Sequence, residues 1–81
     1  MTSAERKHVE KVKCLPCSVC DLHGPSDAHH IEQGQHFTVV ALCKDCHQGL
    51  HNGWHGRKAM WAVREMNEMD ALNITLKRIY E

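Results

Sequence analysis

The apolar residues of the chain are concentrated in a short central run and in a C-terminal stripe. The run, residues 37–42, reads Phe-Thr-Val-Val-Ala-Leu, and its β-branched and aromatic residues predict a strand. Residues 28–32 form a second strand candidate, and the Gln-Gly-Gln sequence at 33–35 lies between the two as a turn. The pattern therefore predicts a β-hairpin.

Helices are expected after the second strand. The pattern predicts a helix from Asp45 or Cys46 through His51 that stops at Asn52-Gly53, a typical C-terminal cap. No Gly or Pro follows Gly56, so the rest of the chain is expected to be helical.

Asn67 is predicted to cap a last helix. The apolar positions of that helix step by three and four, which is typical of a face buried in the core: Met69, Leu72, Leu76 and Ile79. Four apolar residues before it are expected to pack over the preceding segment: Met60, Trp61, Val63 and Met66.

Residues 1–13 are polar and lack a complete cap-to-cap pattern, so they are interpreted as a frayed helix or a disordered arm. The predicted organisation has three parts. A polar N-terminal arm covers residues 1–13, a metal-binding core covers 14–56, and a helical segment over 57–81 packs on that core.

The length and composition point to a metal. A domain of 81 residues buries little apolar surface and usually needs additional stabilisation, such as a bound metal. Five cysteines and eight histidines can supply the ligands of such a metal. No apolar segment typical of a secretion signal or a membrane span is present, which predicts a cytoplasmic protein. In that compartment, cysteines at CxxC spacing are metal ligands more often than disulfides.

Two CxxC pairs, Cys17/Cys20 and Cys43/Cys46, flank the predicted hairpin. Four thiolates around one tetrahedral ion form a closed, structural zinc site. The alternative of buried free cysteines is disfavoured by the presence of two such pairs. Cys14 could replace Cys17, but the Asp-x-x-Gly sequence after Cys20 favours Cys17, leaving Cys14 as a spare thiol or a core residue.

Four histidines form a second candidate site. His47 and His51 are four residues apart on a predicted helix, so both rings lie on one face and can share a metal. His29 and His30 are adjacent on a predicted strand and therefore point to opposite faces, which suggests one ligand and one base. Three neutral imidazoles with open positions are typical of a catalytic metal.

The order of these motifs resembles that of the HNH, or ββα-metal, nucleases over about residues 17–52. The sequences Asp-Ala-His-His-Ile and Leu-Cys-Lys-Asp-Cys-His-Gln-Gly-Leu-His are also similar to phage-borne, RecA-dependent nucleases related to recombination enhancement function (Ref). The resemblance implies a small α+β fold, a zinc-stapled ββα-metal finger with C-terminal helices. It also implies a metal-dependent DNA endonuclease.

The resemblance assigns a role to each histidine. His29 matches the first metal ligand, His30 the general base and His47 the last histidine of the motif, which is a ligand. His51 resembles an extra ligand of histidine-rich, colicin-type sites. The asparagine in the name of the family is missing, and Thr38 occupies or neighbours its place, with His36 close by.

The expected reaction is hydrolysis of a DNA phosphodiester by a one-metal mechanism. Neutral His30 would take a proton from water, which suits an imidazole with a pKa of about 6.5. The family precedent implies 5′-phosphate products. The expected cofactors are a structural Zn²⁺ and a catalytic divalent cation, for which three imidazoles favour Zn²⁺, Mn²⁺ or Ni²⁺ over Mg²⁺.

The formal net charge is +0, so DNA contacts must come from local clusters. The candidates are Lys44, Arg57, Lys58 and His55, the last expected as a surface or phosphate-contacting residue because Gly53 interrupts the helix before it. A RecA filament is the partner that the resemblance implies. A monomer or weak dimer without membrane contact is expected.

Two other interpretations remain at this point. A non-catalytic zinc module that binds nucleic acid or protein would carry the same CxxC pairs, but it has no use for the four histidines. A redox protein would use its CxxC pairs in a βαβ context, which this chain lacks.

Overall fold

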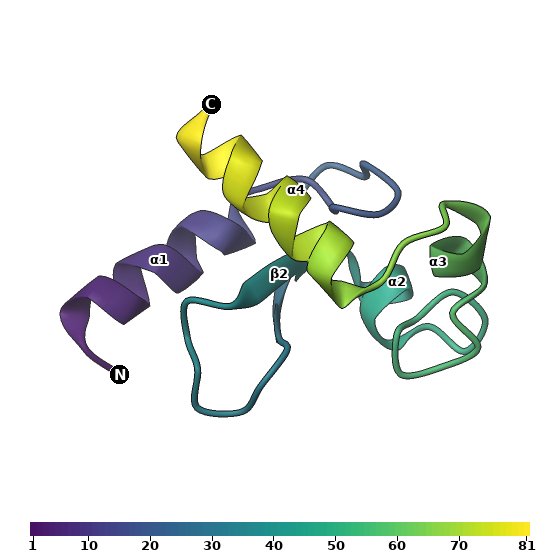
Figure 1. The fold of residues 1–81 in the computed structure, drawn as a ribbon, viewed down its shortest axis with the longest axis horizontal. Coiled ribbons are helices and arrows are strands. Elements are labelled where there is room, and N and C mark those ends of the chain that lie inside the picture. Colours follow the sequence, from purple (N-terminus) through teal and green to yellow (C-terminus); the bar gives the residue numbers. More distant parts are fainter.

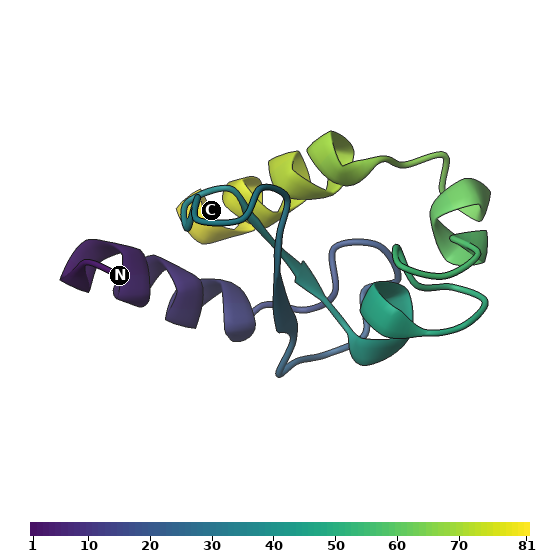
Figure 2. The same cartoon turned by 90° about the horizontal axis from the view of Figure 1, so that it is seen from below.

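The computed structural model covers residues 1–81 and contains four helices and one two-stranded sheet. The elements, in chain order, are α1 (Ser3–Lys13), β1 (Asp27–His30), β2 (Val39–Leu42), α2 (Lys44–Gln48), α3 (Ala59–Val63) and α4 (Glu68–Tyr80). Helix α4 crosses the hairpin, with α1 at one end of the molecule and α2 and α3 at the other (Figures 1 and 2). The chain is thus a small α+β fold, and none of its helices combines the length and apolar character needed to cross a bilayer.

The hairpin is shorter than the sequence predicts. Strands β1 and β2 pair antiparallel with His29 opposite Val40 and His30 opposite Val39, and a loop over residues 31–38 connects them. The prediction of strands over 28–32 and 37–42 with a tight turn is wrong at the inner ends. There the polar residues 32–35 are exposed, and a turn from Glu32 to Gln35 replaces further strand pairing.

Strand β2 is buried on both faces, which explains its uninterrupted apolar sequence. Val40 and Leu42 lie in one hydrophobic cluster with the CxxC cysteines. Val39 and Ala41 point the other way and pack with residues of α1. Because successive side chains of a strand alternate between faces, this one strand connects the two halves of the core.

Residues 3–13 form a capped helix, which replaces the expectation of a frayed helix or a disordered arm. The Thr2 side chain accepts a hydrogen bond from the backbone of Glu5, and the Glu5 carboxylate accepts one from the backbone of Thr2. This capping box satisfies two N–H groups that would otherwise lack partners. Val9 and Val12 are buried against the hairpin, so α1 is packed and not free.

Helix α4 also begins with a capping box, formed by Asn67 and Asp70, as the cap prediction at Asn67 anticipated. Its buried residues are Ala71, Leu72 and Thr75. The predicted apolar face is therefore right at Leu72 and, with partial burial, at Leu76 and Ile79. It is wrong at Met69, which is 64% exposed because the face directed at the core runs through positions 68, 72 and 75.

Trp61 on α3 is the largest fully buried side chain, and its indole Nε1 donates a hydrogen bond to the Cys46 carbonyl at 2.9 Å. Met60 and Met66 pack on the same cluster, as expected. Val63 does not, because it lies two positions beyond Trp61, about 200° around the helix. It is 75% exposed.

Polar side chains of α4 connect it to the rest of the fold. The Thr75 hydroxyl lies 2.7 Å from that of Ser18 and accepts the backbone N–H of Ala41. The Arg78 guanidinium donates to the carbonyls of Pro16 and Cys17. The first CxxC segment and the hairpin are therefore both held by the C-terminal helix.

Candidate metal centres

Four thiols converge at the end of the hairpin nearest α2. The sulfur atoms of Cys17, Cys20, Cys43 and Cys46 all lie within 4.8 Å of one another. Cys20 and Cys43 are 3.6 Å apart at sulfur, and no cysteine forms a disulfide. Tetrahedral zinc with bonds of about 2.3 Å requires sulfur separations of about 3.8 Å, so the four thiols fit a structural metal such as zinc.

Local backbone geometry shapes this group. Asp21 has a positive φ of 65°, which turns the chain after Cys20. Cys43 is the N-terminal cap of α2, and its sulfur accepts the backbone N–H of Cys46. Such N–H groups stabilise negative charge on thiolates.

The thiols of the group differ in acidity. Burial raises the pKa of the Cys17 thiol, but backbone N–H groups of Cys20, Cys43 and Val19 outweigh it and lower the pKa below its usual value. Burial raises the pKa of Cys43 to about 11 and, together with the charge of Cys17, raises that of Cys46 further. A bound cation would favour deprotonation of all four thiols.

Cys14 lies outside this group. It is exposed at the end of α1, where its backbone N–H caps the helix. The choice of Cys17 over Cys14 in the first CxxC pair therefore agrees with the geometry, and Cys14 is a free surface thiol.

Three histidines form a second group. His29, His47 and His55 each offer a ring nitrogen within 4.8 Å of the others, and their ring centroids are 5.1 to 5.3 Å apart. His29 is buried, His47 is half-buried and His55 is exposed. The rings thus surround a point that is open to solvent on one side. Tetrahedral metal sites with bonds of about 2.1 Å place nitrogens about 3.4 Å apart, so small side-chain rotations would suffice to bind an ion.

His51 does not belong to this group, because α2 ends at Gln48 and not after His51 as predicted. Gly49 takes an extended conformation, with φ −62° and ψ 144°. The backbone then folds back on the helix: the N–H of Trp54 donates to the Cys46 carbonyl, and that of His55 donates to the His47 carbonyl. The return of the chain, rather than helical spacing, places His55 beside His47.

A carboxylate holds each of the two inner imidazoles. Glu68 Oε2 lies 2.6 Å from Nε2 of His29, and Asp27 Oδ2 lies 3.1 Å from Nδ1 of His47. Asp27 is two residues before His29 on the same face of β1, whereas Glu68 is the first residue of α4. Carboxylates in this position orient imidazole ligands and leave the other ring nitrogen available for a metal.

The electrostatics of His29 favour its neutral form. Burial lowers the pKa of this imidazole, and the hydrogen bond and charge of Glu68 offset only part of that effect. A neutral imidazole is the form that binds metal ions.

His30 has a different environment from His29, as the alternation of strand residues predicts. Its Nε2 lies 3.0 Å from Nδ1 of His36, and the two rings are perpendicular. Thr38, the predicted orienting residue for the base, instead donates a long 3.4 Å hydrogen bond to the Gln35 carbonyl within the same loop. The side chain next to His30 is therefore that of His36.

The basic residues predicted to contact DNA are exposed and come from two segments of the chain. Arg57 and Lys58 follow His55 in the same exposed loop, whereas Lys44 is the exposed first residue of α2. The Lys58 ammonium lies over the Trp54 ring, 3.9 Å from its centroid. In this arrangement Lys58 makes a cation–π contact with its own chain.

Comparisons with protein-family models, with curated proteins and with solved structures found no match.

Sequence reasoning missed three members of the histidine site. His55 was set aside as a ligand because Gly53 was expected to interrupt the helix, yet the chain leaves the helix already at Gly49 and returns to place His55 beside His47. Asp27 carried a signal, since it shares a strand face with His29. Glu68 carried none, because it is 39 residues from its histidine and only the tertiary fold joins them.

Proposed function

We propose that the chain is a metal-dependent DNA endonuclease of the HNH, or ββα-metal, type. The observation that carries the proposal is the triangle of His29, His47 and His55, open on one side and separate from the four-thiol group. Three protein ligands with an open position are typical of catalytic metals, whereas four thiolates are typical of structural zinc.

In this proposal His29, His47 and His55 hold the catalytic cation, with His55 in the place first assigned to His51. Such a cation stabilises the charge that develops on the phosphate and on the leaving 3′ oxygen. Asp27 and Glu68 keep the imidazoles of His47 and His29 in the tautomers that present a free nitrogen to it. Three imidazole ligands favour Zn²⁺, Mn²⁺ or Ni²⁺ over Mg²⁺.

His30 acts as the general base in the proposed reaction. Its ring takes a proton from the water that attacks phosphorus, and it contributes about 10²–10⁴-fold to the rate. His29 and His30 are adjacent in β1 but face opposite sides, so the ligand and the base do not compete for one position.

Arg57 and Lys44 are the proposed phosphate contacts, because both are exposed and lack a bonded acidic partner. Lys58 joins them if DNA draws its ammonium away from Trp54. The neutral chain offers little surface for reading sequence, so we propose weak sequence preference and presentation of DNA by a RecA filament. A phage or prophage origin and a role in recombination follow the same resemblance.

The test is nicking of supercoiled plasmid by the zinc-loaded chain with Mn²⁺, Ni²⁺, Zn²⁺ or Mg²⁺, with and without RecA filaments. His47→Ala should lower cleavage by at least about 100-fold, because a catalytic cation is worth several kcal/mol. His51→Ala serves as the matched control, since it removes an exposed histidine of the same segment that lies outside the triangle. It should retain cleavage close to that of the unmodified chain.

Metal stoichiometry separates this proposal from a non-catalytic zinc module. The nuclease should bind one tight zinc and a second, exchangeable ion that His47→Ala removes. One tight ion only, together with no cleavage under any of these conditions, would favour the module and overturn the proposal.

A further inference from the structure

The loop between β1 and β2 carries an imidazole directed at His30. Nδ1 of His36 lies 3.0 Å from Nε2 of His30, and the rings are perpendicular with centroids 5.1 Å apart. At that distance one nitrogen must donate and the other accept. Both side chains are half-buried, so the pair is partly shielded from competing water.

The direction of this hydrogen bond decides what His30 can do. If His36 donates from Nδ1, then Nε2 of His30 is the acceptor, Nδ1 of His30 carries the proton and no lone pair of His30 remains free. If His30 donates from Nε2, its Nδ1 is an unprotonated nitrogen able to accept a proton from water. Only the second arrangement agrees with a general base, so this inference rests on the proposed function.

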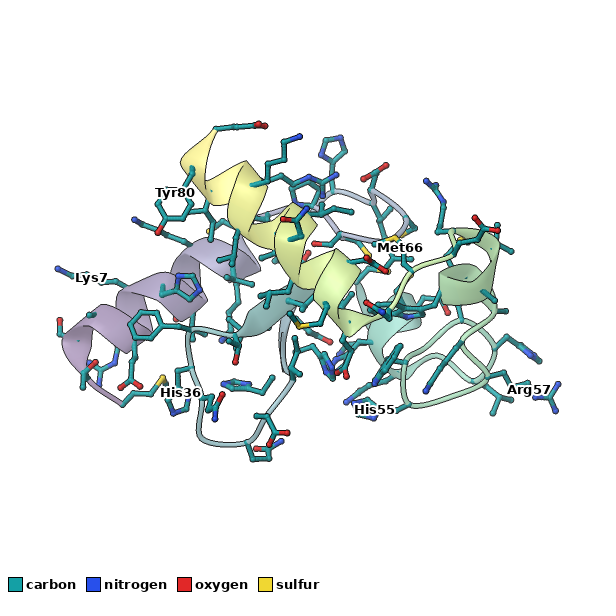
Figure 3. The ribbon with its side chains drawn as sticks, viewed as in Figure 1. Lys7, His36, His55, Arg57, Met66 and Tyr80 are labelled. Atoms are coloured by element: carbon teal, nitrogen blue, oxygen red, sulfur yellow. The ribbon has the colours of Figure 1, made fainter.

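Helix α1 positions the loop that carries His36. The His8 ring packs against Phe37, the next residue, with centroids 5.3 Å apart and a tilt of 52°. Figure 3 shows His36 beside the N-terminal half of α1, on the same lower edge of the view as His55. Within the loop, the backbone N–H of Gln35 bonds the Glu32 carbonyl and that of Ile31 bonds the Thr38 carbonyl. The contact of α1 with Phe37 and the hydrogen bonds within the loop thus both hold His36 in its position.

We propose that His36 is the positioning residue of the general base: its Nδ1 accepts the Nε2–H of His30, which fixes the ring and leaves Nδ1 of His30 free for the attacking water. His36 thereby does the orienting work first assigned to Thr38. The α1 helix has a part in the same function, because its His8 supports the loop.

The inference can be tested by NMR without any measurement of cleavage. Long-range ¹H–¹⁵N spectra of the zinc-loaded chain, recorded at pH about 8, report which nitrogen of each histidine carries the proton. His30 should be held as the Nε2–H tautomer in the unmodified chain. In His36→Ala it should become a mixture of tautomers, while His23→Ala, which removes an exposed histidine elsewhere, should leave it unchanged.

Two substitutions at position 36 distinguish positioning from a loss of structure. The Oδ1 of asparagine occupies the place of histidine Nδ1, so His36→Asn should keep the His30 tautomer and cleavage within about threefold. Glutamine places its oxygen one bond farther out, so His36→Gln should behave like His36→Ala. His36→Gln and His36→Ala are both expected to lower kcat by about 10–100-fold, without changing KM for DNA or binding of the second ion.

The two proposals fail in different ways. A His30 tautomer that His36→Ala leaves unchanged, or a failure of asparagine to preserve it, would overturn the role of His36 even in an active nuclease. A fixed Nε2–H tautomer in a chain that never cleaves DNA would overturn the nuclease proposal and retain the hydrogen bond between the two histidines.

Discussion

At the scale of single residues, the histidine site depends on charges that are not themselves in the triangle. Glu68 lies 2.6 Å from His29 and Asp27 lies 3.1 Å from His47. An imidazole without such a partner can present either nitrogen and can rotate, so it binds a metal less well. The carboxylates therefore set both the tautomer and the direction of the two inner ligands.

The removal of one carboxylate should weaken metal binding without unfolding the chain. We expect Glu68→Ala to lower the affinity of the histidine site by about 10–100-fold and Glu68→Gln to lower it less, since the amide oxygen can still accept from His29. Titration with Co²⁺ or Mn²⁺ of the zinc-loaded chain measures this. Asn67 and Asp70 still cap α4 in either variant.

Glu10→Ala removes a carboxylate from the exposed surface of α1 and is the control for a change of net charge. It should leave the affinity as it was. Equal affinities for Glu68→Ala and the unmodified chain would show that Glu68 does not orient His29.

The sequence predicts which residues could bind a metal better than it predicts which side chains contact one another. The cysteine pairs were identified by local spacing, and they converge as expected because the hairpin joins them. The pairing of His30 with His36 was not predicted, because it depends on the course of a loop that hydrophobic periodicity does not describe.

At the scale of elements, the loop over residues 49–58 places His55, and glycines make its course possible. A Cβ at Gly53 would lie 2.6 Å from the backbone nitrogen and oxygen of Gly49, and a Cβ at Gly56 would lie 2.4 Å from the Gly49 oxygen. Contacts this short leave no space for a side chain, so backbone segments meet here directly. The same closeness lets the loop hydrogen-bond to α2.

Gly53→Ala should disrupt the histidine site and leave the four-thiol site intact. The added methyl group would push the loop away from Gly49 and displace His55, so the second ion and plasmid nicking should be lost to about the extent seen with His55→Ala. The four-thiol zinc should remain, as measured by metal analysis. Leu50→Ala, which trims a 72% exposed side chain of the same loop, should change neither.

Elements were predictable where a repeating pattern or a local cap defines them. The hairpin followed from a run of β-branched and aromatic residues, and α4 followed from apolar spacing and from the cap at Asn67. The end of α2 was not predictable in this way. The Asn-Gly signal at 52–53 suggested a helix end there, but the chain is already non-helical from Gly49. The Thr-x-x-Glu capping box of α1 is a local signal in the sequence, and it favours a capped helix over a frayed helix or a disordered arm.

At the scale of the whole molecule, one small core depends on both ends of the chain. Cysteines of the four-thiol group form part of the main hydrophobic cluster together with Trp61, Val40 and Leu72. Only 18 of the 81 residues are buried, so apolar burial alone gives a marginal fold. The metal is then expected to contribute a large share of the stability.

The magnitudes make the result of metal loss predictable. A domain of this size has a free energy of unfolding of about 4–12 kcal/mol, from about 0.05–0.15 kcal/mol per residue. Structural zinc contributes apparent binding free energies of about 10–16 kcal/mol. Removal of the zinc by a strong chelator, or Cys43→Ser, should therefore unfold the chain, measured as loss of the far-UV circular dichroism signal and of bound zinc.

Readdition of zinc should restore the signal of the chelated protein but not that of Cys43→Ser, because the substitution removes both a ligand and the sulfur that caps α2. Cys14→Ser is the matched control: it removes an exposed thiol outside the group and should leave zinc content and signal unchanged. A folded, zinc-loaded Cys43→Ser protein would contradict a four-thiolate site. Loss of zinc and unfolding in Cys14→Ser would contradict the position of Cys14 outside the four-thiol group.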